Sequence, residues 1–108
     1  MELSFIEYQK EARRTANTNL SERMVYANFG MGLAGESGEV CDYLKKVAFH
    51  DHDLDKEKLA DELGDVLWYI ANLAEAAGLS LADIAVGNIE KLRKRYPDGF
   101  DPARSKNR

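Results

Sequence analysis

Residues 59–70 read LADELGDVLWYI, and this stretch decides the fold class. Its apolar side chains recur at the three- and four-residue spacing of an α-helix, and the pattern continues to Leu73. Leu67, Trp68 and Tyr69 widen the apolar surface well beyond one stripe. A helix that is apolar on most sides is buried on most sides. In a chain of only 108 residues this predicts at least a homodimer, with Trp68 or its neighbours near the interface.

The rest of the chain also predicts helices, and we expect one all-α domain spanning residues 1–108. Ser4 to Glu7 fits a capping box that opens a helix ending near residue 17, followed by a short helical stretch over 21–29. Longer helices are expected over 31–48, from a cap at Asp53 or Asp55 to about 77, and over 80–96. The polar tail 103–108 is expected to be loose unless a partner or ligand orders it.

Composition narrows the classes of function. The formal net charge is −4, which argues against a non-specific grip on nucleic acid polymers. We expect no membrane association, since no apolar run approaches the length of a membrane span and the N-terminus has no signal-peptide pattern. The lone cysteine, Cys41, falls in an apolar helical pattern and is expected to be a buried, inert thiol. Cysteine usage fits a reducing, cytoplasmic setting.

Two acidic pairs carry the strongest functional signal. Glu36 and Glu39 are three residues apart, as are Glu62 and Asp65, so each pair shares a helix face. Each pair brackets its helix's apolar stripe, and Gly35, Gly38 and Gly64 stand beside the acids. Two such helices packed face to face would bring four carboxylates together, which favours a bound cation. Oxygen ligands point to Mg²⁺, with Mn²⁺ as an alternative. Two solvated acidic faces are the competing interpretation.

The region 30–38 contains four glycines, Gly30, Gly32, Gly35 and Gly38, which is dense for a helix. Each costs about 1 kcal/mol relative to alanine, so a close approach by another backbone or a ligand is expected there.

Cationic and amide side chains could contact a phosphate ligand. Asn88, Lys91 and Arg95 share one face of the last long helix, and Lys46 shares a face with Glu39. Ordinary surface charge is the alternative for each residue taken alone. His50 and His52 invite a transition-metal interpretation, but they have no third spaced ligand and are expected to be solvated.

The order of these motifs resembles the MazG-type nucleotide pyrophosphohydrolases of the all-α NTP pyrophosphatase superfamily. The resemblance rests on residues 32–40 (GLAGESGEV), 62–66 (ELGDV) and 88–97 (NIEKLRKRYP), and it covers about residues 5–100. It implies a four-helix core, a dimer or a dimer of dimers, and Mg²⁺-dependent cleavage of a nucleoside triphosphate to the monophosphate and pyrophosphate.

The resemblance also implies roles for individual residues. Metal ligands are implied at Glu36, Glu39, Glu62 and Asp65. Phosphate or sugar contacts are implied at Asn88, Lys91 and Arg95, and a position near the nucleoside at Gln9.

Two other functions stay open at this point. A phosphoribosyl-ATP pyrophosphohydrolase belongs to the same superfamily, although the GLAGE opening and the RYP ending are more typical of MazG-type proteins. A non-catalytic helical module that binds nucleotide is the alternative from another class, and the presence of all four acidic residues argues against it.

Overall fold

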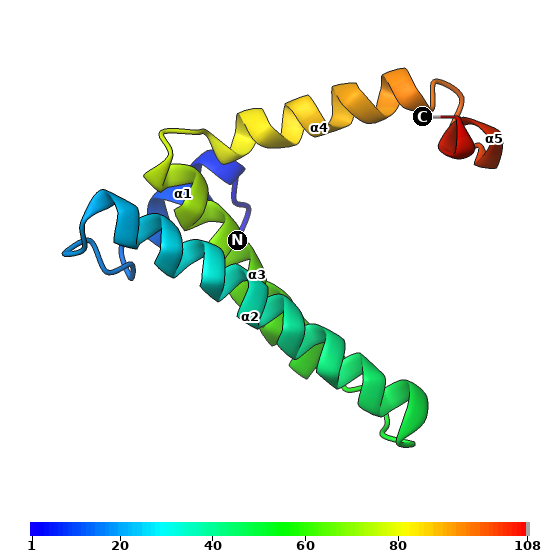
Figure 1. Cartoon of the computed structure of the whole chain (residues 1–108), viewed down its shortest axis with the longest axis horizontal. Coiled ribbons are helices and arrows are strands. Elements are labelled where there is room, and N and C mark those ends of the chain that lie inside the picture. The colour runs from blue at the N-terminus through cyan, green and yellow to red at the C-terminus, as the bar shows by residue number, and fades with distance from the viewer. Residues whose placement is uncertain (108) are drawn as a thin grey trace.

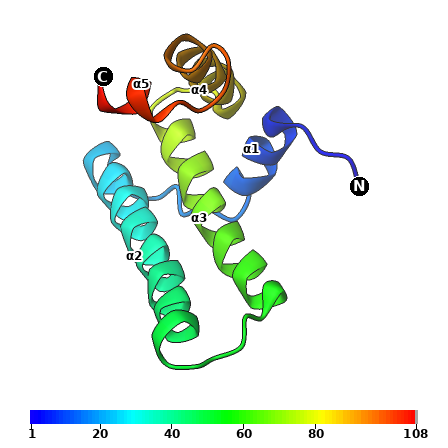
Figure 2. The ribbon, with the colours of Figure 1, turned by 90° about the vertical axis from the view of Figure 1, so that its right-hand side faces the viewer.

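The computed structural model describes residues 1–107 as an all-α chain, which confirms the predicted fold class. The five helices are α1 (Phe5–Arg13), α2 (Glu22–Phe49), α3 (Lys56–Ala76), α4 (Leu81–Arg95) and α5 (Pro102–Lys106). The helices α2 and α3 run antiparallel, and α3 lies between α2 and α1 (Figures 1 and 2). The four longer helices do not close into a bundle within one chain, because α4 runs away from the α2–α3 pair (Figure 1).

The helix starts follow the local sequence. Ser4 and Glu7 form the predicted capping box at α1. Asp55, rather than Asp53, caps α3 by accepting from two backbone N–H groups. The helix α1 ends at Arg13, earlier than expected, and Thr15 Oγ1 donates to the Ala12 carbonyl just beyond its end.

The prediction of two separate helices over 21–48 was wrong, because α2 is continuous from Glu22 to Phe49. Tertiary packing offsets the cost of Gly30 and Gly32. Phe29, directly before them, is fully buried and meets the rings of Trp68 and Tyr69 edge-on at centroid distances of 5.9 and 6.5 Å. Aromatic burial against α3 therefore holds the helix through its glycines.

A small core fixes α1 and the start of α4 on α3. Ala12, Ala71 and Leu81 are its buried members, with Tyr8 and Trp68 packed against them. Asn72, also fully buried, donates from Nδ2 to the carbonyls of Ala12 and Trp68. Gly78 lies in the left-handed region (φ 71°) where α3 ends, and α4 leaves at 104° to α3.

Other expectations need correction. Cys41 is exposed on α2 rather than buried. The tail is not loose throughout: Asp101 caps the short helix α5. Position 108, part of that predicted tail, lies outside the described residues. Trp68 packs within the chain, where its Nε1 donates to Thr15 Oγ1 at 2.8 Å, and the expected interface near Trp68 or its neighbours stays a prediction. Among residues 1–107 no single helix is long and apolar enough to cross a membrane. Only α3 and α4 taken together, as a sharply bent pair, have the length and composition of a membrane span.

The chain is extended for its size. Its radius of gyration is 16.8 Å, against about 13 Å for a compact domain of this length. Its accessible surface is 8305 Å², against about 6,100 Å² for a compact monomer of this mass. Leu63 on α3 is 50% exposed, and Ile89 and Leu92 on α4 are 48% and 40% exposed. Much apolar surface is therefore left uncovered by the single chain.

Candidate metal centre

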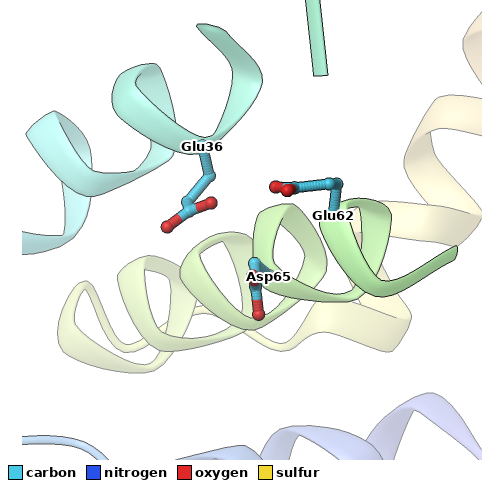
Figure 3. A group of neighbouring side chains, drawn as sticks. All are labelled: Glu36, Glu62 and Asp65. Atoms are coloured by element: carbon cyan, nitrogen blue, oxygen red, sulfur yellow. The ribbon is translucent and has the colours of Figure 1, made fainter. Parts of the chain in front are cut away.

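Three of the four predicted acidic ligands meet between α2 and α3. Glu36 projects from α2, and Glu62 and Asp65 project from α3 (Figure 3). One carboxylate oxygen from each residue lies within 4.8 Å of the other two. Glu36 and Glu62 are half-buried, and Asp65 is exposed. The i, i+3 spacing on α3 and the antiparallel packing of the two helices together produce this cluster.

Glu39, the fourth predicted ligand, is not part of the close cluster. It is exposed on α2, one turn beyond Glu36. Its charge still reaches the cluster, since it contributes to the raised pKa of Glu36. Burial is the largest cause of that raised pKa, followed by the negative charges of Asp65 and Glu62. Repulsion of this kind is relieved when a cation sits among the carboxylates.

Two residues near the cluster were missed by the sequence analysis. Asp61 adds a further negative charge that raises the pKa of Glu36. Tyr8 of α1 is the second residue, and its pKa is raised by burial first and then by the negative charge of Asp65. The pair Asp61–Glu62 is visible in the sequence as two adjacent acids. Nothing in the sequence signals that Tyr8 comes near Asp65, because that proximity depends on how α1 packs on α3.

The cluster fits a hard divalent cation. The donors are all carboxylate oxygens, which is the set that Mg²⁺ and Mn²⁺ prefer. Oxygen ligands lie about 2.1 Å from Mg²⁺, so opposite ligands stand about 4.2 Å apart. The observed span of up to 4.8 Å needs only small side-chain movements to reach that separation.

The predicted phosphate contacts do not reach this cluster within one chain. Asn88 and Lys91 are exposed and Arg95 is half-buried on α4, which runs away from the α2–α3 pair (Figure 1). Lys91 and Arg95 line a shallow hollow on α4 itself. Lys46 is occupied by Asp42, with Nζ 3.2 Å from Oδ2. The single chain therefore brings the acids together and leaves the cations apart from them.

Gln9 is buried and has a structural role within the chain, and its place beside a nucleoside stays a prediction. Its Nε2 donates to Glu75 Oε2 and to the Leu79 carbonyl, and its Oε1 accepts from the Leu81 N–H. Both N–H donors are used, so no side-chain donor is left for a ligand. The tertiary position of α1 decides this role.

A hollow of about 450 Å³ lies along the α2–α3 pair, about one helical turn from the cluster at its nearest lining residues. Gly32 lies one turn before Glu36, and Tyr69 lies one turn after Asp65; both line the hollow. Met24, Met31 and Asn28 of α2 complete much of its wall. A Cβ at Gly32 would overlap the Tyr69 ring, so the missing side chain is what admits this ring. The sequence signal that could have found the hollow is the expected close approach at a helical glycine.

The fold and the cluster define a helical protein whose central helix pair presents carboxylates suited to a divalent cation. The sequence profile of the MazG nucleotide pyrophosphohydrolase domain matches residues 26–100, and the chain belongs to that family. This confirms the resemblance drawn from the motifs. The matched range includes the acidic cluster and α4 but not Gln9.

Two relatives illustrate the similarity. The gene 37 protein of Mycobacterium phage L5 is 36% identical over 83 residues, which is 72% of this chain and 72% of that protein. The YvdC protein of Bacillus subtilis (strain 168) is 46% identical over 41 residues, 38% of this chain and only 39% of its own length. Neither name states a substrate. No solved structure matches the chain.

Proposed function

We propose that the chain hydrolyses nucleoside triphosphates to nucleoside monophosphates and pyrophosphate, with Mg²⁺ as the preferred cofactor and Mn²⁺ as a substitute. The observation that carries this proposal is the carboxylate cluster of Glu36, Glu62 and Asp65 between α2 and α3. Membership of the pyrophosphohydrolase domain family supports the reaction class. These three residues would hold the cation, and Glu39 would join them from one turn away.

The cation and the side chains have separate tasks. When bound, Mg²⁺ would neutralise negative charge on the phosphate oxygens. Glu39, which would reach the cation from one turn outside the close cluster, would keep one carboxylate oxygen free to orient a water molecule and accept its proton. The water oxygen forms a bond to the α-phosphorus as the bond from that phosphorus to the bridging oxygen breaks. Pyrophosphate leaves with that oxygen and its electron pair.

The hollow beside the cluster is the proposed position of the nucleoside. Its wall is mostly apolar, with the Tyr69 ring available for stacking and the Asn28 amide available for hydrogen bonds. Along the helix axes, Tyr69 lies about one turn, roughly 6 Å, beyond Asp65, and Asn28 lies about two turns, roughly 12 Å, before Glu36. A nucleotide whose phosphates lie at the carboxylates could therefore place its base or sugar in this hollow.

A second copy of the chain is proposed to complete the site, as a homodimer or homotetramer. The single chain exposes roughly 2,000 Å² more surface than a compact monomer of its mass, which exceeds the roughly 800 Å² that each partner buries in a standard interface. Gly35 and Gly64 flank the cluster with nothing nearby within the described chain, which leaves room for a partner's side chains. Asn88, Lys91 and Arg95 of the partner's α4 would supply the positive charge that a triphosphate needs. Lys46 would contribute only after leaving Asp42.

A substrate panel tests the proposed function. The protein is incubated with each nucleoside and deoxynucleoside triphosphate, and with phosphoribosyl-ATP, in Mg²⁺, Mn²⁺ or a chelator, and released pyrophosphate is measured. We expect metal-dependent release of pyrophosphate from one or more of the triphosphates. Asp65→Asn should abolish this release. The matched control Glu57→Gln, which alters an exposed acid in the first turn of α3, should keep it.

The panel also separates the alternatives. Turnover of phosphoribosyl-ATP alone would identify the biosynthetic pyrophosphohydrolase. Nucleotide binding without pyrophosphate release from any substrate would refute the enzymatic proposal in favour of a binding module. The proposed setting is the cytoplasm, with no nucleic acid polymer and no membrane as partner.

A further inference from the structure

The Gln9 side chain joins three elements through one buried amide. It is 7% exposed, and its three hydrogen bonds measure 2.8–2.9 Å. The partners are Glu75 in the last turn of α3, the Leu79 carbonyl in the connection, and the N–H of Leu81, the first residue of α4. These contacts are 66 to 72 residues distant in sequence. One side chain thus ties α1 to both sides of the corner between α3 and α4.

The corner between α3 and α4 sets the direction of α4, together with the contacts that α4 makes with α1 and α3 near its start. Gly78 makes the turn with φ 71°, and Leu79 N–H donates to the Ala74 carbonyl at 2.8 Å. Leu81 is buried in the core, but α4 is exposed along almost all of its length beyond Ala85. Few contacts past the first turn resist a change in the helix's angle. The Gln9 amide is the group that links α1, the turn and the N-terminus of α4.

The length of α4 amplifies any change at the corner. Arg95 lies 14 residues beyond Leu81, which is about 21 Å along the helix axis. A rotation of about 10° at the corner would therefore move Arg95 by roughly 4 Å. Charge-assisted hydrogen bonds require donor–acceptor distances of about 2.7–2.9 Å, so a movement of this size removes them.

We propose that Gln9 is a positioning residue that sets the angle of α4, and thereby places the phosphate-binding side chains of that helix. Its effect on α4 follows from the hydrogen bonds alone. Its effect on catalysis rests on the proposed function, in which Lys91 and Arg95 act at a partner's carboxylate cluster.

The direct test measures the angle of α4 without any substrate. Cys41 is the only cysteine and is exposed on α2, so it accepts one spin label, and Lys94→Cys on α4 provides the second. Pulsed electron paramagnetic resonance of this protein, diluted into excess unlabelled protein, reports the distance between the labels within one chain. We expect Gln9→Ala to broaden and shift this distance distribution. Lys10→Ala, which alters the exposed residue next to Gln9 on α1, is the matched control and should leave the distance distribution unchanged.

A second set of variants guards against a general loss of folding. Glu75→Ala removes one acceptor at an exposed position and should broaden the distribution less than Gln9→Ala. Gln9→Glu places two carboxylates against each other and should disturb the corner. Combining Gln9→Glu with Glu75→Gln restores a donor and an acceptor across the same contact, and should bring the distribution part of the way back.

Steady-state kinetics then test whether the angle of α4 affects the proposed catalytic site. For Gln9→Ala we expect kcat/KM to fall by about 10- to 100-fold, as misplaced binding groups do, while the calorimetric Mg²⁺ affinity stays that of the unaltered protein. An unchanged label distance in Gln9→Ala, or an equal change in Lys10→Ala, would overturn the proposal. If the unaltered protein hydrolyses no nucleotide, the proposed function fails, and the label distances still decide the role of Gln9.

Discussion

Replacing Gly32 by alanine tests the packing that forms the hollow beside the carboxylates. An added Cβ would lie 2.5 and 2.6 Å from the Cζ and Cδ1 atoms of Tyr69, closer than real Cβ contacts come. The Tyr69 ring must therefore move. It meets Trp68 edge-on at a centroid distance of 4.9 Å, and this contact would be strained or lost.

The expected change in the free energy of unfolding for Gly32→Ala follows from two opposing effects. Alanine in place of glycine inside a helix stabilises by about 1 kcal/mol. Overpacking costs about 1–3 kcal/mol, and a lost aromatic pair costs roughly 0.5–1.5 kcal/mol more. The net expectation for Gly32→Ala is a destabilisation of about 1–3 kcal/mol. Gly30→Ala is the matched control, because nothing within 4 Å meets a Cβ there, and it should stabilise by up to about 1 kcal/mol.

Urea denaturation at several protein concentrations measures both variants against the unaltered protein, and so separates chain stability from dissociation. The two variants should differ by about 2–4 kcal/mol in the free energy of unfolding. If Gly32→Ala is as stable as Gly30→Ala, then Tyr69 does not rest against α2, and the hollow does not have the shape described.

Four further predictions concern the site and the assembly. Calorimetric titration should show Mg²⁺ affinity falling at least about tenfold in Asp65→Asn and less in Glu39→Gln, since only Asp65 is in the close cluster; equal losses would contradict the assignment. Lys91→Ala should lower kcat/KM by about 10- to 100-fold with unchanged Mg²⁺ affinity, whereas Arg93→Ala, on another face of α4, should change neither. Because the pKa of Glu36 is raised in the folded state, the metal-free protein binds this proton more tightly than the unfolded chain does. Its melting temperature in chelator should therefore fall as pH rises through the range just above 4.5, the ordinary glutamate pKa, and Glu36→Gln should reduce that fall. Light scattering at micromolar concentration should give at least twice the chain mass of 12.2 kDa, and a monomer would refute the proposed assembly.

The sequence by itself determined the features that depend only on residues close together along the chain. The cap at Ser4, the turn at Gly78 and the apolar stripe of α3 follow from local hydrogen bonding and helical periodicity, and all three were predictable. The acidic pairs were also visible, because residues three apart share a face on any helix. That spacing, together with the glycines beside it, carried the family resemblance as well.

Tertiary structure decided which side chains actually meet. Glu36 joins Glu62 and Asp65 while Glu39 stays outside, because the angular position of each residue relative to the facing helix depends on how α2 packs on α3. Gln9 has a structural role because α1 packs its amide against the corner between α3 and α4. The helix α2 continues through Gly30 and Gly32 because Phe29 is buried against α3. Helix propensity and spacing are properties of one segment, whereas burial and close contact are properties of two segments together, and only the folded chain brings those segments together.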